Sequence, residues 1–503
     1  MSMRNMNRFI VGLSVSVLAM MVLGSPYKDG DTVVFFGDSI THGGRYHAYL
    51  TDFYRTRYPD ANIRFVNSGI GGDNAGDAIR RIPEDIAEYN PTHVAIHFGM
   101  NDVGRRGYRE ESNAQSLIGR EERQARYRMN MSALISEIRR AVPQAKLLYL
   151  TPTHYDDTAV ITNVPPNWTG WQSVNQVGCN VGLSLMAGYV LLSAKENGAD
   201  VLDWFSLMSN FIARRRPAEP SFMLTDIDRV HPNPLGHSLM AWEFLKHQGV
   251  SPIVSMVVVD ARDCRATSVV NAKVDAVTAI ENGGVSFDLL AGSIPFPVPE
   301  SSLPFVALCD IEKTLNREVV NVIGLAPGRY ALKIDGESVG EYSDVEFAGG
   351  VWLGFNPKTP QYRQAQAVLA RDEELRQKEA FFRDHHSGRW FFAKRAPVDD
   401  MKAFGEWFEK NVPDKCGYYE KFVPGYLEYW PKRAEERSKL WLDQQAVRLL
   451  AKPVKRHYEL VPTSMLGMTS GDGSHERLDK EAVRRRSADD MCSSAAAIRI
   501  AGR

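Results

Sequence analysis

The chain has 503 residues, of which 44% are hydrophobic, and this length allows two to four domains. Its 60 basic and 61 acidic side chains nearly cancel, so no excess of positive charge favours nucleic acid as a partner. The five cysteines are far apart and form no Cys-x-x-Cys pair, so neither a metal nor another cofactor is predicted, and Cys264–Cys309 is the one disulfide considered.

Residues 1–25 are typical of a secretory signal peptide. Arg4 and Arg8 precede an apolar run from Phe9 to Gly24 that ends at small residues. A membrane anchor is the alternative, but the run is slightly short for a spanning helix. We therefore expect the mature protein to be secreted or periplasmic, with no stable membrane span after the signal is removed.

Residues 26–250 alternate between strand-like and helical patterns, which is typical of a parallel sheet covered by helices on both faces. Ligands of such sheets bind at the carboxyl ends of the strands. The strand-like runs are 32–36, 63–69, 92–99, 145–153 and 199–205. The helical stretches are 47–57, 76–89, 121–142, 180–197 and 235–247.

The second half of the chain has a different composition. Residues 251–355 are rich in Val, Ser, Gly and Pro and predict a small β-sandwich-like accessory domain, in which Asp335-Gly336 forms the tight turn of a hairpin. Residues 356–450 are charged, rich in aromatic residues and helical. Residues 451–503 are weakly patterned and are expected to be mostly disordered. A scaffold or dimerisation module is the preferred interpretation of 251–450, and substrate binding is the alternative.

Four turns at the expected carboxyl edge of the sheet carry polar groups that suit acyl transfer. Ser39 follows the first strand, and a serine hydroxyl becomes a nucleophile when a base takes its proton. His231 could be that base, and Asp228 could orient its imidazole. The N–H groups of Ser39 and Gly72 and the side-chain amide of Asn101 could stabilise an oxyanion. Taken singly, each residue could instead be a helix cap, a turn residue or a surface ion pair.

The four blocks together resemble the SGNH hydrolases, which are also called GDSL esterases and lipases. They are GDSI at 37–40, the glycine at 72, GMND at 99–102 and DRVH at 228–231, and their order and spacing match the family. The resemblance implies a three-layer α/β/α, flavodoxin-like domain. It also implies a catalytic Ser39, Asp228 and His231, with an oxyanion hole formed by Ser39, Gly72 and Asn101. Ile40 replaces the leucine that is commoner in the family.

The predicted function is hydrolysis of a short-chain ester, acetyl above all, through an acyl-enzyme intermediate. Export and the accessory domain favour an acetylated polysaccharide or oligosaccharide as the substrate, and similar secreted enzymes are carbohydrate acetylesterases. Trp168 and Trp171, in a polar insert, could contact sugar rings or could pack the insert onto the sheet. His154, at the end of the fourth strand, could also reach substrate. The alternatives are a lipid-directed esterase or lysophospholipase and a non-catalytic carbohydrate-binding or structural protein.

Overall fold

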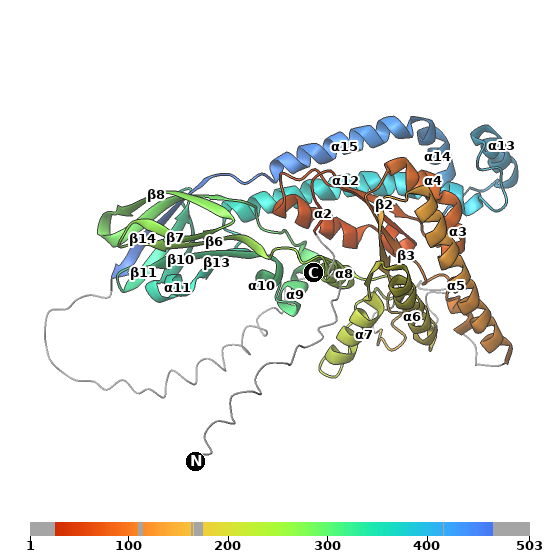
Figure 1. The fold of residues 1–503 in the computed structure, drawn as a ribbon, viewed down its shortest axis with the longest axis horizontal. Coiled ribbons are helices and arrows are strands. Elements are labelled where there is room, and N and C mark those ends of the chain that lie inside the picture. Colours follow the sequence, from red (N-terminus) through yellow and green to blue (C-terminus); the bar gives the residue numbers. More distant parts are fainter. Residues whose placement is uncertain (1–25, 109–113, 162–163, 165–174, 416, 466–503) are drawn as a thin grey trace, which may run out of the picture.

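The computed structural model describes residues 26–108, 114–161, 164, 175–415 and 417–465. One end of the molecule holds a parallel sheet surrounded by helices, the other end holds two further sheets, and long helices near the carboxyl terminus run along the first part (Figure 1). The predicted signal peptide, residues 1–25, lies outside the described residues. Within the described ranges, no helix has both the length and the apolar character that crossing a membrane requires.

The parallel sheet has the strand order β2-β1-β3-β4-β5. Its central strands are apolar and buried on both faces, as expected where helices cover both sides. Phe35 of β1 packs against Phe244 on one face, whereas the ring of Phe36 lies below the guanidinium of Arg81 on the other. The strands are β1 (Thr32–Gly37), β2 (Arg64–Gly69), β3 (His93–His97), β4 (Lys146–Leu150) and β5 (Asp200–Leu202).

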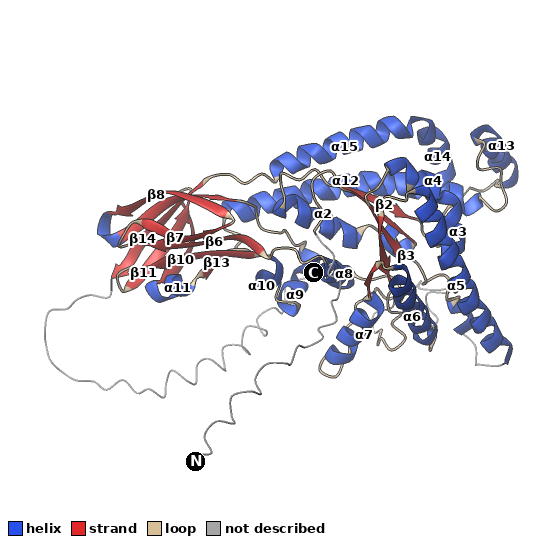
Figure 2. Ribbon diagram, in the orientation of Figure 1, coloured by secondary structure: helices blue, strands red, loops and turns tan. Residues whose placement is uncertain are grey.

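Helices cover both faces of this sheet and complete the three-layer α/β/α domain (Figure 2). Helices α2 (Arg45–Arg57) and α8 (Pro234–His247) pack together on the Phe35 face. Helices α5 (Ala114–Ala141) and α6 (Cys179–Asn197) lie on the opposite face, where Tyr127 donates a hydrogen bond to the carbonyl of Phe98. The remaining helices are α1 (Ser39–His42), α3 (Ala75–Ala78), α4 (Ile82–Asp85) and α7 (Trp204–Arg215).

Two elements of this domain differ from the sequence-based expectation. The fifth strand ends at Leu202, and residues 204–205 begin α7, because the Asp203 side chain accepts from Ser206 N–H and caps the helix. The helix expected over 76–89 is divided into short pieces, with Pro83 near the start of α4.

Two sheets that share one buried cluster form the β-rich part. The predicted hairpin is present, since β11 and β12 pair antiparallel around Asp335 and Gly336, whose φ angles of 53° and 82° fit a primed turn. One sheet has the order β13-β10-β6-β7 and the other β12-β11-β14-β9-β8. The strands are β6 (Ile253–Asp260), β7 (Arg265–Val270), β8 (Ala272–Ile280), β9 (Gly284–Ala291), β10 (Arg317–Ile323), β11 (Gly328–Ile334), β12 (Glu337–Ser343), β13 (Val351–Trp352) and β14 (Arg456–Met465).

The prediction of a disordered tail from residue 451 is wrong for its first part. Strand β14 is inserted between β11 and β9, and Tyr458 and Leu460 are buried in the shared β cluster. A single alternating strand of ten residues is hard to recognise when its partners lie more than a hundred residues away. Residues 466–503 lie outside the described residues. The prediction of a Cys264–Cys309 disulfide is also wrong, because both residues are free thiols.

Part of the expected accessory segment packs on the parallel-sheet domain instead. Phe296, Phe305 and Leu315 are buried in the same cluster as the parallel sheet. The helices of this segment are α9 (Leu303–Leu308) and α10 (Ile311–Leu315), and α11 (Asp344–Gly349) lies against β10. The parallel-sheet domain therefore includes residues of this later segment, and does not end at residue 250 as the sequence predicts.

The predicted carboxyl-terminal helical region is present, and it packs against the parallel sheet domain. Helix α12 (Pro360–Phe392) contacts α2, β2 and α15 (Arg433–Leu450). Arg383 of α12 is only 5% exposed and reaches the end of β2. Helices α13 (Met401–Asn411) and α14 (Val423–Tyr429) complete this region, which has an aromatic cluster of its own.

Glu318 is buried where the β sheets meet α12, and this predicts a pH-dependent stability. Its carboxyl group accepts a hydrogen bond of 2.8 Å from Gln361, and burial raises its pKa to about 7 despite that bond. The unfolded chain ionises near pH 4.5, so stability falls as pH rises from about 4.5 to 7. Glu318→Gln removes this loss, and we expect the free energy of unfolding of the variant, relative to the wild type, to rise by about 2.5 kcal/mol between pH 5 and pH 8.

Urea denaturation at the two pH values measures this difference. Glu341→Gln is the control, because Glu341 is exposed and its pKa is lowered by Arg329, so it stays ionised across the window. An advantage of Glu318→Gln that is equal at pH 5 and pH 8 would contradict the burial of a neutral Glu318.

Candidate active site

The strand register brings the predicted site residues to one edge of the parallel sheet. Gly37 at the end of β1 pairs with Gly69 of β2 and His97 of β3. The segments that follow these three residues carry Ser39, Gly72 and Asn101. The loop that carries Asp228 and His231 is closed by a bridge from Thr225 to Pro232, just before α8.

Ser39, His231 and Asp228 form a continuous hydrogen-bonded chain. His231 Nε2 lies 2.9 Å from Ser39 Oγ, and His231 Nδ1 lies 2.5 Å from Asp228 Oδ2. Because the carboxylate can only accept, Nδ1 carries the proton and Nε2 is left to accept from the serine hydroxyl. Burial disfavours the charge of Asp228, but the hydrogen bond and charge of His231 prevail and lower its pKa. The ionised Asp228 therefore orients a base that faces the serine.

Asp38 fixes the turn that presents Ser39. Its Oδ1 accepts from the backbone N–H of Ile40 at 3.0 Å, which starts the short helix α1. The side chain is fully buried, and burial raises its pKa to about 6. Gly37 is required just before it, because a Cβ there would lie 2.7 Å from the carbonyl oxygen of His97. The turn can therefore leave the sheet at this point only with a glycine.

Two further candidate donors, Gly72 and Asn101, lie on the segments that follow β2 and β3. Gly72 has a φ of +75°, which favours glycine, and its backbone turns at the end of the β2 loop. Asn101 donates one amide hydrogen to the carbonyl of Asp73 at 2.8 Å, and this bond orients its second N–H group. Asp102 accepts from Ala75 N–H at 3.1 Å, and burial raises its pKa to about 7.

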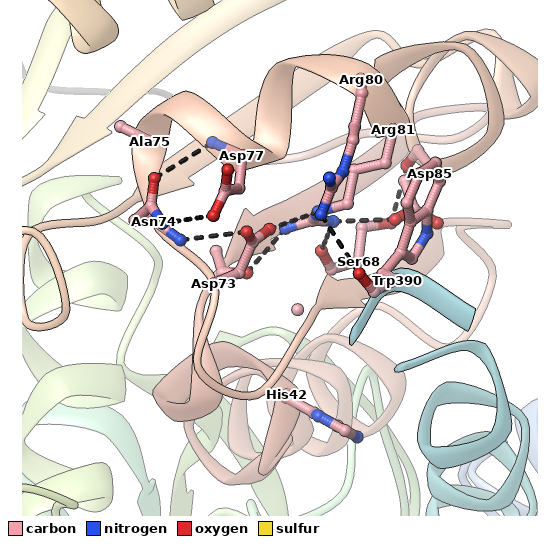
Figure 3. Close-up of polar contacts among 12 residues, drawn as sticks. His42, Ser68, Asp73, Asn74, Ala75, Asp77, Arg80, Arg81, Asp85 and Trp390 are labelled. Atoms are coloured by element: carbon pink, nitrogen blue, oxygen red, sulfur yellow. Dashed lines mark hydrogen bonds and ion pairs between the residues drawn. The ribbon is translucent and has the colours of Figure 1, made fainter. Parts of the chain in front are cut away.

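Arg81 is a residue of this site that the sequence analysis missed. It is 1% exposed and donates to the carbonyls of Gly37 (2.8 Å), the last residue of β1, and Ser68 (2.6 Å), the last but one of β2. Figure 3 shows its guanidinium between the carboxylates of Asp73 and Asp85, at 2.7 and 2.8 Å. One buried cation thus joins the serine turn to the loop that carries Gly72. A lone arginine in a helical pattern gives no sequence signal for this role.

A cavity of about 500 Å³ opens beside Gly72 and Asn101, two of the three candidate oxyanion donors. No aliphatic side chain is among its described lining residues, which are glycine, polar, charged or aromatic. The lining residues are Gly72, Asn101, Gly104, Arg105, Arg106, Arg123, Gln176 and Tyr419. Tyr419 comes from the carboxyl-terminal helical region, which the sequence analysis did not connect with the site.

His154 is buried, and its side-chain contacts are with residues of α6 and α7. It contacts Ser209 Oγ of α7 at 2.9 Å and Asn180 Nδ2 of α6 at 3.3 Å. These contacts give it a role in joining two helices, and its contact with substrate stays a prediction. Trp168 and Trp171 lie outside the described residues. Among the residues that are described, no group of three or more His, Cys, Asp or Glu side chains could hold a metal ion.

Comparison with known proteins also relates this chain to acylhydrolases. Residues 35–239 match the GDSL-like Lipase/Acylhydrolase family. An acetylxylan esterase from Geobacillus stearothermophilus is 27% identical over 235 residues, which are 44% of this chain and 94% of that protein. The solved structure of a gut microbial diltiazem-metabolizing enzyme is 27% identical, with a TM-score of 0.77 over 88% of this chain and 99% of that one. The second likeness extends well beyond the parallel sheet domain.

Proposed function

Because residues 35–239 belong to the GDSL-like lipase/acylhydrolase family, we propose that this esterase hydrolyses a short-chain ester, with acetyl as the acyl group and a carbohydrate as its carrier. The observation that carries the catalytic assignment is the hydrogen-bonded chain of Ser39, His231 and Asp228. The homologous acetylxylan esterase supports the choice of acyl group.

The proposed reaction has two steps. Ser39 Oγ attacks the ester carbonyl while His231 Nε2 takes its proton, and the tetrahedral oxyanion is held by the N–H groups of Ser39 and Gly72 and by Asn101 Nδ2. The intermediate collapses as His231 protonates the departing alcohol, which leaves an acyl-Ser39 ester. Water, deprotonated by His231, then attacks this ester, and the carboxylic acid leaves as the serine regains its proton.

The side chains that line the cavity favour a small acyl group on a polar carrier over a lipid. A long acyl chain gains its binding free energy from burial of apolar surface, about 25 cal/mol per Å². The described lining of the cavity beside Gly72 and Asn101 offers arginine, glutamine and tyrosine side chains instead. Hydroxyl-rich sugars find hydrogen-bond donors in such a lining. Export of the protein stays a prediction that rests on residues 1–25.

Acyl-chain preference tests the substrate proposal. We expect p-nitrophenyl acetate to be hydrolysed with a kcat/KM at least about tenfold above that of p-nitrophenyl octanoate, because no aliphatic side chain among the described lining residues offers the longer chain a hydrophobic contact. Acetate release from acetylated xylan and from an acetylated pectin then identifies the carrier. A preference for octanoate would contradict the short-chain proposal and would favour a lipid substrate.

A further inference from the structure

The loop that leads from β2 to Gly72 is held by residues of the carboxyl-terminal helical region. Arg383 of α12 donates two hydrogen bonds to the carbonyl oxygen of Gly69, at 2.9 and 3.2 Å. The same guanidinium donates to Asp85 at 2.8 Å, so Asp85 lies between Arg81 and Arg383. Although burial opposes its ionisation, these cations keep the pKa of Asp85 well below its usual range.

His42 connects the same loop to α12. The backbone N–H of Gly71 donates to His42 Nδ1 at 3.0 Å. Nδ1 therefore carries no proton, and Nε2–H points to Asp384 of α12 at 3.1 Å. The His42 side chain is 11% exposed and that of Asp384 is 35% exposed, so this contact lies near the surface of the interface.

Tyr419 makes the third contact, and it is the closest to the candidate oxyanion hole. Its hydroxyl donates to the carbonyl oxygen of Gly71 at 2.9 Å. A Cβ on Gly72 would lie 3.0 Å from that hydroxyl, so the tyrosine occupies the space beside the glycine. The ring of Tyr419 is stacked on Phe391 of α12 with 4.5 Å between ring centroids, which fixes its position.

The carbonyl of Gly71 and the N–H of Gly72 belong to one peptide unit. A peptide unit is planar, so holding its oxygen also fixes the direction of its N–H group. A hydrogen bond accepted by the carbonyl oxygen further polarises the unit and strengthens the N–H as a donor. Tyr419 thus acts on the donor proposed for the oxyanion without touching the oxyanion.

We propose that the carboxyl-terminal helical region positions the oxyanion hole, with Tyr419 as the positioning residue for the N–H group of Gly72. Asp384 supports the same loop through His42. The proposal rests on the proposed function, since it assigns Gly72 to the oxyanion. It gives residues 360–450 a role in the reaction of the family domain, which neither a scaffold nor a dimerisation module would have.

Tyr419→Phe tests this role, because it keeps the stacked ring and removes only the hydroxyl. We expect kcat on p-nitrophenyl acetate to fall about tenfold with KM unchanged, which is less than the hundredfold or greater loss from removing a direct donor. The inhibition constant of phenylboronic acid, whose serine adduct is tetrahedral, should rise by about the same factor. Tyr418→Phe is the matched control, since Tyr418 is 63% exposed and the substitution keeps its ring, which packs edge-on against Tyr419 with 4.9 Å between centroids. It should leave kcat unchanged.

Asp384→Asn is a second test variant. Because Asp384 is partly exposed, we expect this variant to fold. We expect a smaller loss of kcat, again with unchanged KM, because the neutral amide is a weaker acceptor for His42. If kcat and the boronate inhibition constant are unchanged in both variants, the proposal is overturned. If Ser39→Ala retains the activity of the wild type, the proposed function fails instead, so the two failures are distinguishable.

Discussion

Replacing Ser39 with alanine is expected to lower kcat on p-nitrophenyl acetate by a factor of about 10⁴ or more. The serine oxygen lies 2.9 Å from His231 Nε2, in a position to be deprotonated, and no acyl-enzyme forms on Ser39 without it. Residual turnover would come from the oxyanion donors acting on water. Steady-state kinetics with the purified protein, and thermal denaturation to confirm folding, measure the effect.

The double variant of Ser39 and His231 is the control for this interpretation, because the effects of the two substitutions should not add. His231→Ala alone is expected to lower kcat by a similar factor, and the double variant should be no worse than Ser39→Ala, because the two residues act as one unit. Equal activity of Ser39→Ala and the wild type would remove the nucleophile assignment. Independent, multiplying losses in the double variant would contradict a shared proton transfer.

Arg81→Met is expected to destabilise the folded protein by about 3 to 5 kcal/mol. The substitution preserves much of the side-chain length but removes the cation paired with the buried carboxylate of Asp73 and one donor from each of two backbone carbonyls. Asp85 retains Arg383 as its partner. Urea denaturation monitored by tryptophan fluorescence gives the change in free energy of unfolding.

The same substitution should also lower the activity of the folded fraction, because Arg81 joins the carbonyl of Gly37 to Asp73 on either side of the site. Arg329→Met is the control, since Arg329 and Glu341 form an exposed ion pair and such pairs contribute little. A loss of stability in Arg81→Met no larger than in Arg329→Met would contradict the role of this buried cation.

Local patterns predict the parallel sheet and the positions of its site residues. Apolar runs end at glycine turns, and parallel pairing places those turns at one edge, so Ser39, Gly72 and Asn101 could be expected near one another. Asp228 and His231 are close in sequence, and their loop precedes a helix with an N-cap asparagine and a proline, both visible in the sequence. The contacts that depend on this local order are therefore accessible to sequence reasoning.

Contacts between distant segments are not accessible in this way. Tyr419 reaches Gly71 across 348 positions and Arg383 reaches Gly69 across 314. Both belong to a helical region whose amphipathic pattern says which face is apolar but not which surface it covers. Strand β14 shows the same limit, because its partners in the sheet are fixed by tertiary packing rather than by its own residues.

Covalent labelling identifies the nucleophile directly. Diisopropyl fluorophosphate phosphorylates activated serines with loss of fluoride, and the site is identified by intact mass followed by peptide mapping. We expect one adduct per chain, on Ser39, formed by the wild type and absent from Ser39→Ala, with labelling strongly slowed in His231→Ala. An active protein that carries its label on another residue, or that remains active without any label, would contradict Ser39 as the nucleophile.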